Sequence, residues 1–117
     1  MINNKVFYAP LLCLVLASCS PQPEWILSGS INGMDRNEWH SASESKKLGT
    51  AGYWLLSLER KNWLNDPSLI EGDSFKQASI ELKNCIDNHL TFSEKPTNAI
   101  VADCVYKKGW QNKNKNN

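Results

Sequence analysis

Two cysteines in the second half of the chain are spaced for covalent or metal chemistry. Cys85 lies ten residues before Lys95, and Cys104 lies nine residues after it. Residues 93–96 between them, Ser-Glu-Lys-Pro, have the composition of a turn. Cysteines at nearly equal distances from a turn face each other when two antiparallel helices pack. The spacing therefore suits a disulfide across a helical hairpin.

The same cysteines could instead bind zinc. His89 is four residues after Cys85, so the two side chains would share one face of a helix. With Cys104, and with Asp103 or His40 as a further ligand, they could form a zinc site. The spacing is not that of a standard zinc motif, since the chain has no Cys-x-x-Cys. We therefore expect no metal and no other cofactor.

Enzyme signatures are absent from the sequence. It contains no Gly-x-Ser-x-Gly, no His-Glu-x-x-His and no glycine-rich phosphate loop. The nearest cluster of catalytic residue types is His40 and Ser41 with Glu44. Neighbours in sequence rarely form a triad, and Ser41 is more simply a turn or cap residue. His89 fits a packed, hydrogen-bonded side chain better than a ligand. We expect that the protein is not an enzyme.

The start of the chain has the order of parts of an export signal. A short polar segment with one lysine precedes a mostly apolar run over residues 6–16. That run is well short of the roughly 20 residues that span a bilayer as a helix. The four residues Leu16-Ala17-Ser18-Cys19 resemble the lipobox of bacterial lipoproteins. The resemblance implies that residues 1–18 are a signal peptide and that Cys19 is lipidated through a thioether to diacylglycerol.

Lipidation implies a location in the cell. With an added amide-linked acyl chain, Cys19 would carry two or three chains, and two or more anchor a protein stably to a membrane. Ser20 follows, at the position where Asp favours inner-membrane retention in lipoproteins of the enteric type. We expect the protein at the cell envelope, on the periplasmic face of the outer membrane if the organism has one. In that oxidising compartment, Cys85 and Cys104 are expected to form one disulfide.

Length and charge limit what the mature chain can be. Removing the signal peptide from the 117 residues leaves 99, enough for one small domain. Lys5 leaves with the signal, so 12 basic residues balance 12 acidic ones, and nucleic-acid binding is not expected. We expect a lipidated N-terminus and tether over residues 19–33, a helical domain over residues 34–110 and a disordered polar tail over residues 111–117. Within the tether, residues 24–33 fit a loop or one short strand.

All five tryptophans lie after the signal peptide, a large share for so small a domain. Trp fills small cores well, but it is also frequent at the centres of binding interfaces and can stack on sugars. Most of these side chains are therefore expected in the core or half buried. Trp25, Trp63 and Trp110 are the candidates for partner binding.

Helical spacing of apolar residues predicts a first long helix capped by Ser43 and ending near Asn62. Small residues at and beside Gly52 would let another helix approach it closely. A short turn before this helix is expected to be capped by Asp35 or Asn37.

Two more helices are expected after it. One has Asp73 or Ser74 as its N-cap, and the other is capped by Thr97 and followed by Gly109 in the left-handed conformation. Strand signals are weak throughout. The sequence therefore predicts an all-α bundle of three to four short helices with one disulfide.

Several segments together resemble small disulfide-bonded helical proteins of bacterial envelopes. They are Lys-Leu-Gly-Thr-Ala-Gly-Tyr-Trp at residues 47–54, Glu-Leu-Lys-Asn-Cys-Ile at residues 81–86, Cys104, and Gly109-Trp110. Some proteins of that kind are immunity proteins that block toxins delivered by neighbouring cells. The resemblance is one of architecture and assigns no residue a role.

We therefore expect a protein-binding lipoprotein, held on the membrane through Cys19, with another envelope protein as its partner. It would act as an inhibitor, an immunity or exclusion factor, or an accessory part of an envelope machine. The alternatives are a small-molecule or metal-binding lipoprotein and a structural component of the envelope.

Overall fold

The computed structural model describes residues 22–113 of the chain. The α-helices in this part are α2 (Arg36–Ser41), α3 (Glu44–Arg60), α4 (Gly72–Leu90) and α5 (Thr97–Lys107), and the 3-10 helices are η1 (Glu24–Ile26) and η2 (Pro67–Ile70). Over residues 22–113 there is no strand, and a single antiparallel bridge joins Leu64 to Gln111. The predicted all-α class, with three to four helices and one disulfide, is confirmed.

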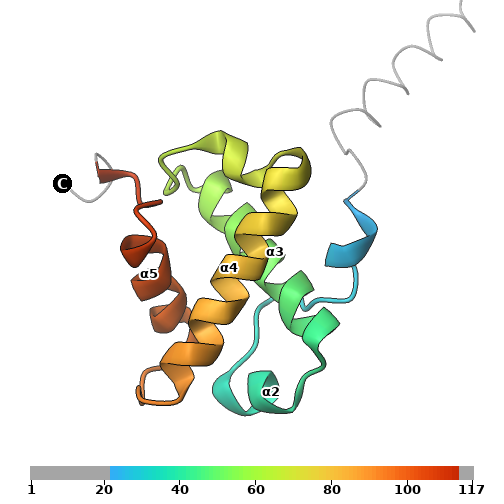
Figure 1. Ribbon diagram of the computed structural model, residues 1–117, viewed down its shortest axis with the longest axis vertical. Helices are drawn as coiled ribbons and strands as arrows, with labels where there is room; N and C mark the ends of the chain where they lie inside the picture. Colours follow the sequence, from blue (N-terminus) through green and yellow to red (C-terminus); the bar gives the residue numbers. More distant parts are fainter. Residues whose placement is uncertain (1–21, 114–117) are drawn as a thin grey trace, which may run out of the picture.

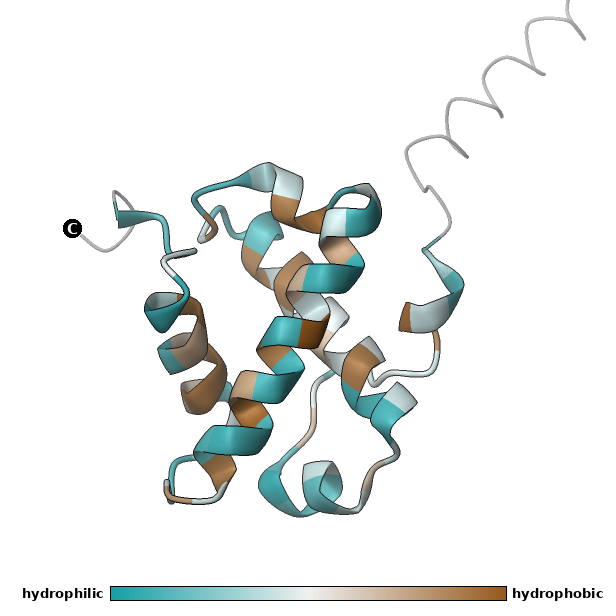
Figure 2. Ribbon diagram, viewed as in Figure 1, coloured by the Kyte–Doolittle hydropathy of each residue, from teal (hydrophilic) through white to brown (hydrophobic). Residues whose placement is uncertain are grey.

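The two longest helices, α3 and α4, cross at the centre of the molecule, and α5 packs along α4 (Figure 1). The 3-10 helix η1 packs on α3, while η2 contacts both α3 and α4. Apolar and hydrophilic bands recur along each long helix (Figure 2). This is the pattern of a helix with one apolar face. In the described part of the chain, no helix is both long and apolar enough to cross a membrane.

The core draws side chains from η1 and from all four α-helices. The largest fully buried apolar side chains belong to Ile26, Trp39, Leu55, Leu82, Ile86 and Ile100. On α4 the side chains of Phe75, Ala78, Leu82 and His89 are buried, and that of Cys85 is half buried. The packing of these faces is the main force holding the short helices together, since isolated helices of this length are marginal in water.

The domain is larger than predicted at both ends. Residues 24–33 were expected to belong to a tether, as a loop or strand, but Glu24–Ile26 forms η1 and Ile26 is fully buried. At the other end, Gln111 pairs with Leu64 and so belongs to the folded domain rather than to the tail. The lipobox, Cys19 and residues 114–117 of the tail lie outside the described residues.

The predicted caps of α2 and α3 are confirmed. Asp35 accepts a hydrogen bond from the backbone N–H of Glu38 (2.8 Å), and the Glu38 carboxylate accepts one from the backbone N–H of Asp35 (2.9 Å). This reciprocal pair is a capping box. The Ser43 side chain accepts from the backbone N–H of Lys46 (3.2 Å). Because each cap needs only residues three apart, the sequence was enough to place it.

The predicted caps of α4 and α5 are wrong. Neither Asp73 nor Ser74 caps α4, because the helix begins at Gly72, immediately after η2 and the intervening Glu71. Thr97 is the first residue of α5 and not its cap. Its buried hydroxyl instead donates to the backbone carbonyl of Met34, a tertiary contact across 63 residues.

A small-residue face on α3 permits close approach, but the approaching segment is η1 and the turn after it, not the predicted helix. A Cβ on Gly49 would lie 2.5 Å from the backbone nitrogen of Gly29, and one on Gly52 would lie 2.8 Å from the Trp25 ring. At Gly49 the approaching segment meets α3 with its backbone, and at Gly52 it meets α3 with the Trp25 ring.

Candidate functional site

A groove of about 490 Å³ lies between α3, α5 and the loop after η1, and its lining includes the aromatic rings of Tyr53, Trp54 and Trp63. Its lining residues are Ile31 and Asn32 of the loop, Tyr53, Trp54, Ser57 and Leu58 of α3, Lys61 and Trp63 beyond α3, and Asn98, Val101 and Ala102 of α5. We name it the α3–α5 groove. On each helix the lining residues recur at intervals of three or four, some of them with an adjacent residue. Each helix therefore contributes one face to the groove.

Trp63 stands at the end of α3 with 45% of its surface exposed. Asn62 before it has a positive φ of 61°, the left-handed conformation that Asn tolerates better than most residues. The N–H of Asn62 donates to the carbonyl of Glu59 (2.8 Å), and that of Trp63 donates to the carbonyl of Leu58 (2.9 Å). This is a Schellman motif, which turns the chain sharply and directs Trp63 back toward Leu58 in the groove.

Lys61 adds the one positive charge among the described residues of this groove. Its Nζ lies 5.8 Å from the centre of the Trp63 ring, a cation–π distance. None of the described lining residues is acidic. The groove therefore offers aromatic and aliphatic surface, the cation of Lys61, and the amides of Asn32 and Asn98.

Trp54 connects the groove to the core. Its ring stacks on the buried ring of Trp39, with the ring centres 5.8 Å apart. Gly33, with φ of 81°, passes so close that a Cβ there would lie 3.0 Å from the Trp54 indole nitrogen. The Trp54 ring is thus packed by both Trp39 and Gly33, which makes this wall of the groove rigid. By contrast Ile31, in the loop, is 71% exposed.

Behind Trp39, a charged network fixes its orientation. The Trp39 indole N–H donates to the Asp87 carboxylate (2.7 Å), which also pairs with Lys47 (3.2 Å) and Lys83 (3.3 Å). Burial raises the pKa of Asp87, but hydrogen bonds from Trp39 and Lys47 outweigh it, so that the pKa lies below its ordinary value. Glu44 pairs with Lys83 at 2.7 Å, and that hydrogen bond lowers the pKa of Glu44.

A second hollow of about 530 Å³ adjoins the α3–α5 groove and extends it toward the start of α2. The two share Asn32, Trp54 and Asn98. Arg36 is on its wall and donates to the backbone carbonyl of Lys95 (2.9 Å), so this end of α2 is tied to the turn between α4 and α5.

The three tryptophans predicted for partner binding do not form one patch. Trp63 lines the α3–α5 groove, whereas Trp110 lines a separate hollow beside α4. Trp25 is half buried and packs edge-on against Phe75, with ring centres 4.9 Å apart. Of the three, Trp63 is the exposed one, and it lies in a groove of aromatic character.

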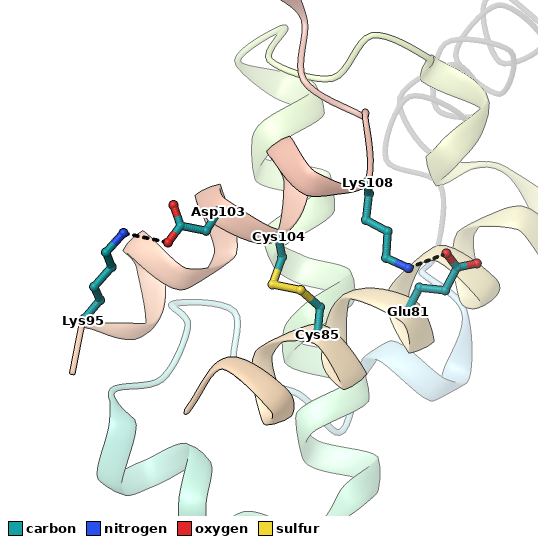
Figure 3. The surroundings of a disulfide bond; sticks show 6 residues. All are labelled: Glu81, Cys85, Lys95, Asp103, Cys104 and Lys108. Carbon is teal, nitrogen blue, oxygen red and sulfur yellow. Dashed lines mark hydrogen bonds and ion pairs between the residues drawn. A yellow bond between two sulfur atoms is a disulfide. The ribbon is translucent and has the colours of Figure 1, made fainter. Parts of the chain in front are cut away.

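The Cys85–Cys104 disulfide forms as predicted and joins α4 to α5, with the two Cα atoms 6.0 Å apart. Figure 3 shows an ion pair on each side of it, Lys108 with Glu81 and Lys95 with Asp103. The zinc hypothesis offered Asp103 or His40 as a further ligand. Asp103 is paired with Lys95 at 2.8 Å, and among the described residues neither Asp103 nor His40 belongs to the cluster that Cys85, His89 and Cys104 form. A ring nitrogen of His89 does lie beside the two sulfur atoms.

The cluster of catalytic residue types near His40 is not assembled. Ser41 donates to the backbone carbonyl of Asn37 (3.1 Å) within α2, and Glu44 pairs with Lys83. His40 is exposed. Ser41 therefore has the local turn role that its position in sequence suggested.

Comparison with known proteins gave no match to any protein-family model, curated protein or solved structure. The site is therefore interpreted from its own geometry.

Sequence reasoning missed most of the α3–α5 groove, including Ile31, Trp54 and Lys61. A partial signal was present, because Trp54 and Leu58, and Ser57 and Lys61, are each four residues apart on α3. What the sequence lacked was the facing wall on α5. Asn98 and Val101 are more than 35 residues further along the chain, and no local pattern pairs them with α3.

Proposed function

We propose that this protein is a membrane-anchored envelope lipoprotein and a protein-binding module rather than an enzyme, with its partner held in the α3–α5 groove. The observation that carries the proposal is Trp63, a large and half-exposed aromatic side chain fixed by backbone hydrogen bonds at the end of a groove. Rigid aromatic anchors next to pockets are the residues that dominate binding energy in protein interfaces.

The lipobox supports a short connection to the membrane. Glu24, the first residue of η1, is five residues after Cys19, the proposed lipid site. Five residues span at most about 18 Å even when fully extended. A partner would therefore meet this domain close to the membrane surface, which suits an inhibitor, an immunity or exclusion factor, or an accessory subunit at the envelope.

The groove also indicates the kind of segment that it binds. An apolar side chain would pack between Trp63 and Trp54, and the amides of Asn32 and Asn98 could pair with the backbone of the segment. Lys61 favours a carboxylate next to the apolar residue. We therefore infer a protein segment with an aromatic or aliphatic residue beside Asp or Glu.

The first test uses photo-crosslinking in intact cells with the full-length lipidated protein. A photoreactive amino acid replaces Asn98, which is exposed at the groove, or Asn84, which is exposed on α4 outside it. We expect one stoichiometric protein partner from position 98 and none from position 84. Equal capture from both positions would contradict the proposal. Crosslinks to cell-wall sugar alone would favour the small-molecule alternative.

The second test measures affinity for the captured partner. Trp63→Ala is expected to weaken binding at least 30-fold, about 2 kcal/mol, the size of a typical hot spot. The matched control is Tyr106→Ala, which removes an aromatic ring that is 71% exposed on α5 outside the groove. Lys61→Glu should weaken binding and reverse its salt dependence. Unchanged affinity of the Trp63→Ala protein would exclude the groove as the binding site.

A further inference from the structure

A set of three metal-ligand atoms lies between α4 and α5. The Sγ atoms of Cys85 and Cys104 and a ring nitrogen of His89 are all within 4.8 Å of one another. Cys85 and His89 are one turn apart on α4, and Cys104 faces them from α5. In the disulfide form both sulfurs are bonded to each other and cannot serve as thiolate ligands.

His89 has a feature that the disulfide form does not explain. Its side chain is buried, with 9% of the residue exposed, and its Nε2 is buried without a hydrogen-bond partner among the described residues. The Phe92 ring lies beside it, with the ring centres 5.2 Å apart, and offers no hydrogen-bond acceptor in its plane. A buried nitrogen left unpaired destabilises a fold, so the unpaired Nε2 points to a use in another state of the protein.

We propose that reduction of the Cys85–Cys104 disulfide converts this cluster into a binding site for one Zn²⁺. A dithiol reductant supplies two electrons and two protons, becomes a disulfide itself, and leaves Cys85 and Cys104 as thiols. Zn²⁺ then displaces one proton from each thiol and binds the two thiolates and the neutral imidazole of His89. A water molecule takes the fourth position, as is usual when three protein side chains hold zinc.

The geometry requires little movement. Zinc lies about 2.3 Å from a thiolate sulfur and about 2.0–2.1 Å from an imidazole nitrogen. Two sulfurs on one tetrahedral ion are therefore roughly 3.8 Å apart, and a sulfur and a nitrogen about 3.5 Å apart. After reduction the sulfurs separate by less than about 2 Å, which rotation about their Cα–Cβ bonds can supply.

The helix pair has other contacts that keep the ligands near one another. Lys108 of the α5 end pairs with Glu81 at 3.1 Å, and Figure 3 shows this pair on the opposite side of the disulfide from the pair of Lys95 with Asp103. Neither pair depends on the disulfide. Bound zinc would replace the lost covalent link and raise the stability of the reduced protein by mass action. This site is separate from the α3–α5 groove and does not rest on the proposed function.

The test compares full-length protein, purified in detergent, before and after treatment with a dithiol that is then removed anaerobically. Zinc content and competition with a coloured chelator give stoichiometry and affinity, and Co²⁺ in place of Zn²⁺ reports thiolate ligation by a charge-transfer absorption band. We expect one zinc per reduced chain and none per untreated chain. His89→Gln should weaken binding at least tenfold. The matched control His40→Gln, at an exposed position on α2, should leave affinity unchanged.

Reduction could also unfold the chain, and circular dichroism covers that case. If the reduced protein loses helical signal, zinc should restore it in the wild type and not in the His89→Gln protein. Substoichiometric zinc in the reduced wild type, equal affinity of the His89→Gln protein, or no recovery of helix on adding zinc would each overturn the proposal.

Discussion

Trp63 and Trp110 occupy the same position at the ends of two different helices, and the segments that carry them are hydrogen-bonded to each other. Trp110 follows Gly109, whose φ is 75°, and its N–H donates to the carbonyl of Val105 (3.0 Å), which repeats at α5 the motif found at α3. The two segments then exchange hydrogen bonds. Asn65 donates its backbone N–H to the carbonyl of Trp110 (2.8 Å), and Asn112 donates its own to that of Trp63 (2.8 Å).

This pairing gives the two tryptophans different roles. The side-chain amide of Asn65 donates to the carbonyl of Gly109 (2.6 Å), and that of Asn112 donates to the carbonyl of Asn62 (3.1 Å). The ends of α3 and α5 are thus locked together over some 45 residues of sequence. Trp110 is turned toward α4 and half buried, whereas Trp63 is left exposed at the groove.

Trp110→Ala should therefore destabilise the fold more than Trp63→Ala does. We expect the free energy of unfolding to fall by about 2–3 kcal/mol for Trp110→Ala, because the ring packs on the core, and by less than about 1 kcal/mol for Trp63→Ala. Urea denaturation of both variants measures the difference. Equal losses would show that the two rings are equally part of the core.

Gly49→Ala should be severely destabilising. A Cβ at this position would lie 2.5–2.7 Å from backbone atoms of Gly29 and Ile26, which cannot rotate away as a side chain could. We expect a loss of about 3 kcal/mol and displacement of η1 from α3. Gly109→Ala is the control. There a Cβ meets nothing within 4 Å, and only the left-handed backbone opposes it, so the loss should be about 1–2 kcal/mol. Thermal melts that rank the two variants in the opposite order would contradict this packing.

Asp87 should stabilise the fold in a pH-dependent way. Its folded-state pKa lies below the ordinary 3.8, so its contribution is present above that pH and is lost as the pH falls through the folded-state pKa. Asp87→Asn should lower the free energy of unfolding near neutral pH by about 1–2 kcal/mol, a value reduced by partial exposure to solvent. The difference between variant and wild type should then shrink toward zero in strong acid. A difference that stays constant across the acid range would show that the charge of Asp87 is not what matters.

Replacing both disulfide cysteines should lower stability without changing the fold. On the chain-entropy model, closing a loop of about 20 residues stabilises the folded state by roughly 3 kcal/mol. The Cys85→Ala/Cys104→Ala protein should therefore melt about 10–20 °C below the wild type while keeping its helical circular dichroism. The ion pair between Glu81 and Lys108, which also joins α4 to α5, should remain in the variant. A melting temperature within a few degrees of the wild type would mean that packing alone holds the hairpin.

The sequence by itself determined the helical class, the cap at Ser43, a cap at Asp35 or Asn37, the left-handed Gly109 and the disulfide. Each of these depends on residues within one or two turns of each other, or on two cysteines placed evenly about a turn. Local hydrogen bonding and the 3.6-residue period are properties of short segments, so a single sequence displays them.

Only the tertiary structure decided how these elements are used. The hydroxyl of Thr97 does not cap α5 but donates a hydrogen bond to the backbone carbonyl of Met34. The segment around Ile26 belongs to the core and not to a tether. The tertiary structure also placed Trp63 at the α3–α5 groove and Trp110 beside α4, although each occupies the same position after its helix. These outcomes depend on which helix faces, far apart in sequence, pack together when apolar surface is removed from water. That packing depends on the whole chain and cannot be read from any one segment.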